Sequence, residues 1–420
     1  MSEPFDAAGG VPPAVDVLRR AATIRERCRN IARGVEAGRS RHFTLEPRRL
    51  DAVADRVAAL TRARFPTFPA HAGMPYHSRW RHFEAGGVDR KAELDRRLAG
   101  RSTAEVARAR IDLALVSVLL DAGAGPQWCY HEGPDAIPFR RSEGLGVASF
   151  RAFLGGCFSS DRADPLRVDA QALAAIDAHA LAEWFQVRPD NPLVGLDGRA
   201  ALLRRLGQAL AGQPAAFGAE GRPGRLFELL ASGGGTVQAE ALLRALLDAF
   251  SAIWPSGQQI GDPPVPVGDA WPHPLAGGEG PSAGWVPFHK LSQWLSYSLL
   301  EPFEWAGVKV EGLDALTGLP EYRNGGLLLD AGVIVPRRQD FAAQVRTPAD
   351  EWVVEWRALA VVLLDELAPR VRERLGATPQ QMPLACVLEG GTWQAGRQIA
   401  AERREGGGPP VQIESDGTIF

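Results

Sequence analysis

The sequence of 420 residues has few cysteines and no long apolar run. The cysteines are far apart and form no Cys-x-x-Cys pair, which argues against a structural zinc site and a disulfide-stabilised fold. They are Cys28, Cys129, Cys157 and Cys386. Apolar stretches such as residues 359–364 are far too short to cross a bilayer. The N-terminus lacks a basic segment followed by an apolar one, so we expect no signal peptide and a cytoplasmic protein.

Lysine is scarce as well, because only Lys91, Lys290 and Lys309 occur among 47 basic residues. In an arginine-rich chain, a lysine that persists is a candidate for a role that a planar guanidinium cannot fill. The net charge of −3 gives no overall attraction to nucleic acid or to anionic membranes, and we expect neither as a partner.

Signature motifs of common cofactor and metal sites are also absent. The sequence contains no GxGxxG, no GxxxxGK[ST] and no HExxH motif. His77 and His82 are separated by a segment with two arginines, which would repel a dication, and the tight acidic pairs lack magnesium spacing. We therefore expect no metal and no cofactor.

Apolar residues recur at helical spacing along most of the chain. The segment 103–122 is apolar on nearly all sides, which is typical of a central helix. This pattern predicts a mainly α fold of one large or two closely packed helical lobes, with a few short strands such as 307–311. Helices are expected at 12–38, 48–64, 103–122, 147–158, 170–186, 197–212, 223–232, 237–254, 287–302, 312–332, 349–374 and 391–404.

Two segments interrupt the helical pattern. Residues 65–92 hold three prolines, three histidines and alternating arginine and aromatic residues, and residues 255–284 are rich in proline and glycine. We interpret both as ordered insertions or long loops within a single domain spanning residues 1–420, although 255–284 is also the plausible internal boundary. Residues 405–420 lack a helix signal and are expected to form an extended tail or hairpin.

Lys290 and Glu321 are the first candidates for chemistry. Lys290 lies near the start of a predicted helix that Pro287 opens, and Trp294 follows one turn later, so the lysine either forms a cation–π contact on an exposed edge or is a buried cation in a cleft wall. Glu321 follows Pro320 in the first turn of another predicted helix, where a carboxylate is favoured electrostatically. It either serves only the helix start or is a rigid carboxylate that can stabilise a developing cation.

Three further groups are candidates for binding. Glu355 lies among tryptophans and needs a partner if it is buried. Glu389 precedes Gly-Gly-Trp, a pattern that we interpret as strand, turn and helix. Two arginines and a serine in residues 139–144 lie at a predicted start of a helix, where they either hold a phosphate or form an ordinary loop pair. Cys129 is predicted to be a buried apolar residue rather than a nucleophile.

Six segments together resemble one family. They are YHSRWRHFEAGGVDR (76–90), FRRSEGLGVASF (139–150), VPFHKLSQWLSYSLLEP (286–302), LTGLPEYRNGGLLLD (316–330), EWVVEWRALAVVLLDEL (351–367) and GGPPVQIESDGTIF (407–420). The chain resembles the ribosylurea-handling family of the uracil-catabolism (Urc) pathway over nearly its whole length. That resemblance implies a functional partnership with a GTP-cyclohydrolase-II-like enzyme.

The order of four motifs is also similar, more distantly, to the queuosine-salvage nucleosidases, which are queuosine 5′-phosphate N-glycosylases. The motifs are the Phe-His-Lys helix, the acid-Tyr-Arg helix start, the Glu-x-Arg helix and the acid before a late Trp. This resemblance implies a helical DNA-glycosylase-like architecture. On that pattern Lys290 matches the family's lysine, and Glu321 and Glu389 take the places of two aspartates. Because both are one methylene longer, the division of their roles stays open.

Together the two resemblances imply metal-free hydrolysis of an N-glycosidic bond, which releases urea from ribosylurea or its 5′-phosphate. Glu321 would then stabilise positive charge at C1′, Glu389 would bind urea or position water, and Lys290 with an arginine would hold a phosphate. The wider set of expected substrate contacts is Trp128, Arg141, Ser142, Glu143, Trp294, Tyr322, Arg323, Glu355, Arg357 and Trp393.

Two other functions remain open at this point. One is a non-catalytic component of uracil degradation that binds a nucleotide derivative in the same pocket. The other is an amidohydrolase acting on the urea group, which the missing metal ligands and the missing Ser or Cys nucleophile signature disfavour.

Overall fold

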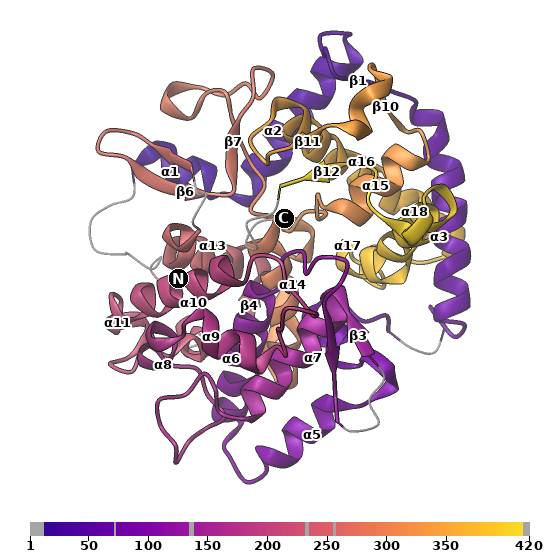
Figure 1. Ribbon diagram of the computed structural model, residues 1–420. Coiled ribbons are helices and arrows are strands. Elements are labelled where there is room, and N and C mark those ends of the chain that lie inside the picture. The colour runs from indigo at the N-terminus through magenta and orange to yellow at the C-terminus, as the bar shows by residue number, and fades with distance from the viewer. Residues whose placement is uncertain (1–11, 71–72, 134–137, 232–234, 255–257, 415–420) are drawn as a thin grey trace.

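The computed structural model describes residues 12–70, 73–133, 138–231, 235–254 and 258–414 (Figure 1). Helices dominate these ranges, and the prediction of a mainly α fold is confirmed. The α-helices are α1 (Pro13–Leu18), α2 (Ala21–Glu36), α3 (Leu50–Arg64), α4 (Arg79–Phe83), α5 (Arg90–Arg97), α6 (Thr103–Leu119), α7 (Arg141–Leu154), α8 (Ala170–Ala175), α9 (Ala178–Trp184), α10 (Leu196–Ala211), α11 (Pro214–Phe217), α12 (Leu226–Ala231), α13 (Ala239–Phe250), α14 (Lys290–Trp305), α15 (Tyr322–Asp330), α16 (Glu351–Leu375), α17 (Leu384–Val387) and α18 (Trp393–Arg403).

Strands are short in the described ranges and pair into six two-stranded sheets. The β4–β9 and β11–β12 pairs are parallel and the other four are antiparallel. Several pairs, such as β1 with β10 and β4 with β9, join segments that are far apart in the sequence. The pairs are β1 (Phe43–Leu45) with β10 (Ile334–Pro336), β2 (Cys129–His131) with β3 (Pro138–Arg140), β4 (Thr236–Gln238) with β9 (Lys309–Glu311), β5 (Gln258–Ile260) with β6 (Val265–Gly268), β7 (Ala270–Pro272) with β8 (Trp285–Pro287), and β11 (Val345–Arg346) with β12 (Gln412–Ile413).

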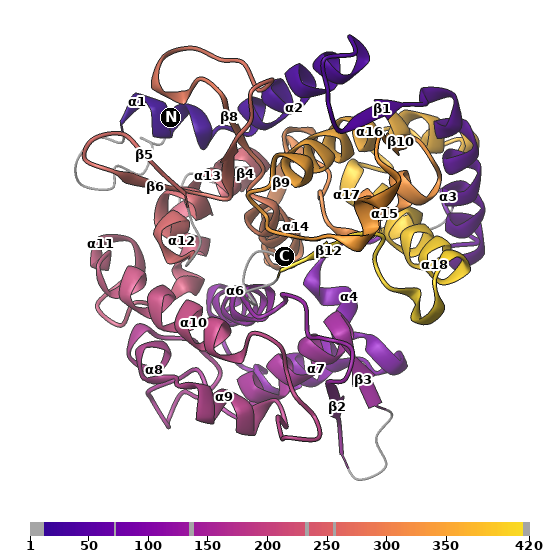
Figure 2. The same ribbon diagram turned by 45° about the horizontal axis from the view of Figure 1, so that its top comes forward.

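Helix α6 forms the centre of the molecule, as its all-round apolar sequence predicts (Figure 2). Every residue from 109 to 120 is buried, and α14 packs along it. The helix begins after Ser102, whose hydroxyl accepts a hydrogen bond from Glu105 N at 3.2 Å. Side-chain oxygen at this position satisfies one of the free N–H groups of the first turn, and so fixes where the central helix begins.

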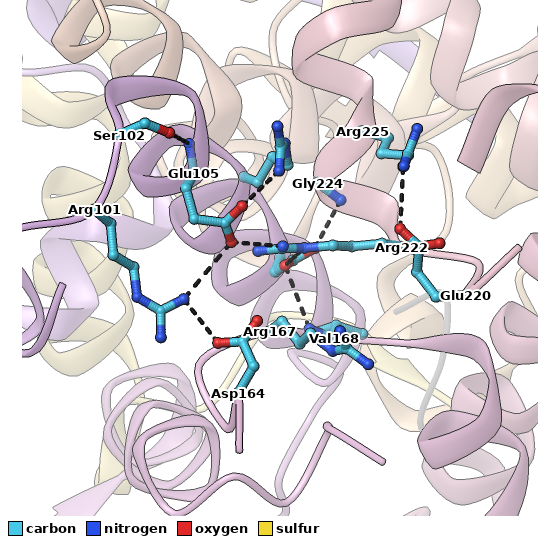
Figure 3. Close-up of polar contacts among 12 residues, drawn as sticks. Arg101, Ser102, Glu105, Asp164, Arg167, Val168, Glu220, Arg222, Gly224 and Arg225 are labelled. Atoms are coloured by element: carbon cyan, nitrogen blue, oxygen red, sulfur yellow. Dashed lines mark hydrogen bonds and ion pairs between the residues drawn. The ribbon is translucent and has the colours of Figure 1, made fainter. Parts of the chain in front are cut away.

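One charged residue, Asp112, is fully buried in the middle of α6. Its carboxylate accepts hydrogen bonds from Arg222 Nε at 2.8 Å, Gly224 N at 2.6 Å and Val168 N at 3.3 Å. Arg222 also donates to Glu105 Oε1 at 2.6 Å, so two loops are anchored to the central helix (Figure 3). Burial raises the pKa of Asp112 to about 6, although Arg222 and the two N–H groups oppose that rise.

The second half of the fold is built around α16, which packs against α2 and α3 (Figure 2). Helices α15 and α18 lie side by side next to it, and α18 reaches α3 although the two are far apart in sequence (Figure 1). A Cβ atom at Gly396 would lie 2.1 Å from Arg323 O. Only glycine therefore allows α15 and α18 to approach this closely.

Some predicted elements are wrong in extent or type. The predicted helix 12–38 is divided into α1 and α2, and 170–186 is divided because Asp177 caps a new helix by accepting from Ala180 N at 2.8 Å. The predicted strand before Glu389 is helical: α17 is followed by the π-helical turn Leu388–Thr392 and then α18. A short buried apolar run does not distinguish strand from helix by periodicity, which explains this error.

The segments predicted as insertions differ in structure. Residues 65–92 contain α4 and the first residues of α5, and the described part of 255–284 contains β5, β6 and β7. Within the tail or hairpin predicted over residues 405–420, β12 pairs with β11, and residues 415–420 lie outside the described residues. Among the described helices, none is both long and apolar enough to span a membrane.

Candidate functional site

Lys290 and Glu321 lie at the starts of two neighbouring helices, α14 and α15. The Lys290 side chain is partly exposed, and its ammonium has no hydrogen bond or ion pair within the described ranges. Burial lowers the pKa of Lys290, and the carboxylates of Glu321 and Asp121 oppose that change because they favour its charge. The structure therefore brings a cation and two carboxylates together without pairing them.

The backbone that carries Lys290 is held in place by Asp269. Its main-chain oxygen accepts from Phe288 N at 2.9 Å and His289 N at 3.1 Å, and its Oδ2 accepts from Lys290 N at 3.0 Å. His289 is in the left-handed region, with φ 48° and ψ 39°. Left-handed backbone at a residue other than glycine is costly and clusters at functional sites.

Arg357, a predicted substrate contact, is fully buried and donates to both oxygens of Asp269, at 2.8 and 2.7 Å. Burial alone would raise the pKa of Asp269, but Arg357, Trp271 and the Lys290 N–H lower it to about 2. Arg357 therefore holds Asp269, and Asp269 in turn fixes the main chain of Lys290 at the start of α14.

Glu321 is the N-cap of α15 rather than a first-turn residue. Its Oε2 accepts from Arg323 N and its Oε1 from Asn324 N, both at 2.7 Å. Asn324 in turn accepts from Thr392 Oγ1 at 2.8 Å, which links this cap to the π-helical turn. The carboxylate is thus held rigidly between α15 and the segment that carries Glu389.

Glu389 is buried, and each of its oxygens has a charged or ionisable partner. Arg64 Nη2 donates to Oε1 at 2.6 Å, and His77 Nδ1 lies 2.9 Å from Oε2. Burial alone would raise the pKa of Glu389, but His77 and Arg64 together lower it. The sequence analysis did not identify His77, because its partner lies 312 residues later in the chain.

The π-helical turn Leu388–Thr392 explains why two glycines follow Glu389. A Cβ at Gly390 would lie 2.8 Å from Met74 Sδ, and one at Gly391 would lie 2.7 Å from Val57 O. The pair allows the wide turn to pack against α3. Such π turns occur frequently at functional sites, and this one directs the Glu389 side chain toward His77.

Aromatic rings surround His77. Its ring centroid is 6.4 Å from that of Trp294 and 6.2 Å from that of Trp393. A second histidine, His82, lies edge-on to Trp294 at 5.7 Å, and burial lowers its pKa to about 3. Two of the predicted tryptophans, Trp294 and Trp393, therefore lie near the same two histidines.

Arg79 and Asp121 complete this region, and neither was singled out from the sequence. Arg79 is fully buried and donates to Asp121 Oδ1 at 2.8 Å and to Ser142 O at 3.2 Å. Its guanidinium carbon lies 5.6 Å from the Trp294 ring centroid. Ser142, a predicted contact, thus takes part through its main-chain carbonyl. The arginine and aromatic alternation in residues 76–83 was the available signal for Arg79.

Beside this region lies a hollow of about 800 Å³ lined by several arginines. Arg397 pairs with Glu143 at 2.7 Å, but the guanidinium groups of Arg140 and Arg141 donate only to main-chain oxygens in the described ranges. Arg323 donates to Gly407 O at 3.3 Å, and burial, together with nearby Arg141 and Arg397, lowers its pKa. The lining residues include Phe139, Arg140, Arg141, Glu143, Arg397, Ala401 and Arg404. This hollow carries an excess of positive charge.

Three predicted contacts are engaged in other ways. Trp128 is fully buried and donates to Phe185 O at 2.9 Å. Burial raises the pKa of Tyr322, which lies next to Glu321 at the start of α15. Glu355 is buried beside Ser40, and His273 Nε2 lies 3.3 Å from its Oε2. Trp128 and Glu355 have well-defined partners within the fold, which accounts for their burial without a ligand.

Glu355 also belongs to a group that could hold a metal by distance alone. Ligand atoms of His273, Glu351 and Glu355 lie within 4.8 Å of one another. However, His273 Nδ1 accepts from Leu275 N at 3.2 Å, so in the neutral ring Nε2 carries the hydrogen. Ligation through Nε2 would move that hydrogen to Nδ1, where it would oppose the Leu275 N–H, so we interpret the group as a buried histidine–glutamate pair.

Comparison with known proteins gives full-length matches. The family model described as "Protein of unknown function (DUF1688)" matches residues 17–420. "Uracil catabolism protein 4" of Lachancea kluyveri is 38% identical over 441 aligned residues, covering 97% of this chain and 99% of that protein. "Protein urg3" of Schizosaccharomyces pombe is 40% identical over 410 residues, covering 94% and 96%. These matches confirm the predicted resemblance to uracil-catabolism proteins, and the chain belongs to the DUF1688 family together with these two relatives.

Proposed function

We propose that this protein acts in uracil degradation as an N-glycosidase that releases urea from ribosylurea or its 5′-phosphate without a metal. The name of the relative from Lachancea kluyveri supports the pathway. One observation carries the chemistry: the ammonium of Lys290 has no paired partner in the described ranges, yet it lies near the fixed carboxylate of Glu321. That combination suits a bond cleavage in which opposite charges develop on the two fragments.

Glu321 stabilises the sugar fragment. When the C1′–N bond breaks, its electron pair moves to the urea nitrogen and C1′ gains oxocarbenium character. A carboxylate held by two N–H groups requires no rearrangement to face that charge. Preorganised charge of this kind is commonly the largest contribution to catalysis.

Lys290 serves the leaving group. The departing urea nitrogen needs a proton, and an ammonium whose pKa is lowered by burial donates one more readily than an ordinary lysine. Positioned proton donors contribute about 10²–10⁴-fold to rates. Replacement of this lysine by arginine would remove the function, because a guanidinium does not deprotonate in proteins.

The arginine-lined hollow is the place for a 5′-phosphate. Arg140, Arg141 and Arg323 have no carboxylate partner in the described ranges, and planar guanidinium groups bind phosphate oxygens in pairs. Ribosylurea without a phosphate would leave the positive charges of these arginines without a negative partner.

A non-catalytic binding component is the second candidate, and one observation favours it. Both oxygens of Glu321 accept main-chain N–H groups, as they do in an ordinary helix cap. In that case the pocket would bind a nucleotide derivative and return it unchanged.

The test is incubation of the purified protein with ribosylurea and with its 5′-phosphate, followed by assay of free urea. Release of urea that scales with enzyme concentration supports the N-glycosidase. Binding of either compound by calorimetry without urea release supports the binding component instead.

A further inference from the structure

We propose that His77 is the base that activates the attacking water, and that Glu389 is its positioning residue rather than a substrate contact. This inference rests on the proposed hydrolysis and extends it, because the acid and the charge stabiliser assigned above leave the water without a proton acceptor.

Glu389 itself has no free oxygen for substrate. Its Oε1 accepts from Arg64 Nη2 at 2.6 Å and its Oε2 faces His77 Nδ1 at 2.9 Å. Arg64 also donates to the main-chain oxygen of Glu389. Unlike Glu321, which is partly exposed and accepts only main-chain N–H groups, Glu389 is 8% exposed and covered by two ionisable side chains, so it is suited to orienting His77 rather than to contacting urea.

The pairing fixes the tautomer of His77. An ionised carboxylate only accepts hydrogen bonds, so Nδ1 must be the donor. In the neutral ring, Nε2 then carries the lone pair, and no described residue bonds to it. A carboxylate that holds one ring nitrogen while the other faces the reaction is a common way to prepare histidine as a base.

The ring of His77 also lies near the helices that carry the other proposed catalytic groups. It is close to Trp294, which follows Lys290 by one turn on α14, and to Trp393, which begins α18 just after the π-helical turn. The main chain of His77 is fixed because its N–H donates to Ala385 O at 3.0 Å. Helices that carry both Lys290 and Glu389 thus meet at this imidazole.

His82 does not fit the same role. It has no carboxylate bonded to its ring, and its Nδ1 is both buried and without a partner in the described ranges. Burial also lowers the pKa of His82 to about 3, which makes it a weaker proton acceptor than an ordinary imidazole.

The step balances as follows. The water oxygen bonds to C1′ while the C1′–N electron pair leaves with the urea nitrogen. His77 Nε2 takes one proton from the water, and Lys290 gives one proton to the urea nitrogen. The products are urea and ribose or its 5′-phosphate, and solvent returns the proton from His77 to Lys290.

The experiment compares His77→Ala, His77→Gln and Glu389→Gln with the parent protein, using urea release from ribosylurea and its 5′-phosphate across pH. His179→Ala is the control, because His179 is an exposed histidine on α9. Thermal midpoints verify that each variant is folded. Each assay is repeated with added imidazole, which can replace a missing side chain that acts as a base.

We expect kcat of His77→Ala to fall about 10²–10⁴-fold and to recover at least about tenfold with imidazole. Glu389→Gln should lower kcat with little change in KM, because the imidazole loses the partner that orients it while the substrate contacts remain. Imidazole should not change His179→Ala.

Two results would overturn the inference, and they are distinguishable from failure of the proposed function. If the parent releases no urea from either compound, the hydrolysis itself is wrong and the role of His77 falls with it. If the parent is active but folded His77→Ala and His77→Gln keep its rate and pH profile, or imidazole gives no recovery, only the base is misassigned.

Discussion

Two buried carboxylates, Asp112 in α6 and Glu389 in the π-helical turn, show how similar chemistry serves different ends. Each has an arginine partner, Arg222 for the first and Arg64 for the second. The other donors to Asp112 are the main-chain N–H groups of Val168 and Gly224, so its contacts end within the fold. The other partner of Glu389 is His77, whose second nitrogen bonds to no residue that the structure describes.

The two sites also differ in electrostatics. Burial opposes ionisation of both groups, yet it raises the pKa of Asp112 to about 6 while that of Glu389 is lowered. The difference lies in the partners, because Glu389 has two neighbours that can carry positive charge. Asp112, which bonds only to groups that hold the fold together, maintains structure. Glu389, which bonds to an imidazole with an unpaired second nitrogen in the described ranges, can support proton transfer.

The largest expected effect is on stability at the Asp112 site. Asp112→Ala leaves Arg222 buried without this partner, and breaking such a pair costs about 3–5 kcal/mol in the free energy of unfolding. Urea or thermal denaturation measures this loss. Turnover per folded molecule should be unchanged, and a selective loss of kcat in a fully stable variant would break the comparison.

The pH dependence of stability tests the same residue. The pKa of Asp112 is about 6 in the folded state against an ordinary 3.8, so the folded state retains a proton that the unfolded state loses. This contribution is fully present below pH 3.8 and is lost as pH rises through about 6, at roughly 1.4 kcal/mol per pH unit. Denaturation of the parent and of Asp112→Asn between pH 4 and 7 should show this slope only in the parent. Equal slopes in both would contradict it.

At Glu321, the expected effect is on catalysis. Glu321→Gln retains one acceptor but removes the charge that faces C1′, so kcat should fall about 10²-fold or more with little change in KM. Loss of a cap charge alone costs about 0.3–1 kcal/mol of stability. Measurement of kcat and of the melting midpoint on one preparation separates the two roles. Full activity with a lowered midpoint would make Glu321 a helix cap only.

Lys290→Met should weaken turnover and substrate binding while leaving the melting midpoint nearly unchanged, because no described ion pair is lost. Lys91→Met is the matched control, since Lys91 pairs with Asp95 on the surface of α5 and lies outside the site. Steady-state kinetics and calorimetry of both variants provide the test. Equal behaviour of the two variants would place Lys290 outside the machinery.

The smallest expected effect is that of chelation. If charge is stabilised by Glu321 and protons are moved by side chains, exhaustive treatment with a chelator leaves urea release unchanged. Loss of activity that one specific cation restores would exclude the proposed mechanism.

The sequence predicted those features that depend on neighbouring residues along the chain, such as helix amphipathicity and helix capping. The nearly complete apolar surface of 103–122 identified the central helix, and Glu321 was placed within one residue of its capping position. The strand predicted before Glu389 failed because a buried helix and a buried strand share the same short apolar run. The interruption between α1 and α2 at Arg19 and Arg20 depends on tertiary packing, which the spacing of apolar residues does not reveal.

Partners distant in sequence were beyond prediction. Arg357 was expected at the substrate, but its guanidinium donates to both oxygens of Asp269, 88 residues earlier. His77 and Asp121 were not singled out, because their significance comes from neighbours on other helices. Glu389 was singled out as an acid before Gly-Gly-Trp, but it lies inside the buried run 382–392, and its contacts with Arg64 and His77 appear only in three dimensions.

The contact at Gly396 sets a limit on how this protein can vary. Because a single methyl group there would collide with Arg323 O, the distance between α15 and α18 has no adjustable margin. Glu321 and Arg323 lie at the start of α15, and Trp393 lies at the start of α18. The lack of a side chain at Gly396 therefore sets the distance between the two helices that carry these site residues. A library of substitutions at position 396 would act as a set of spacers of graded size between α15 and α18.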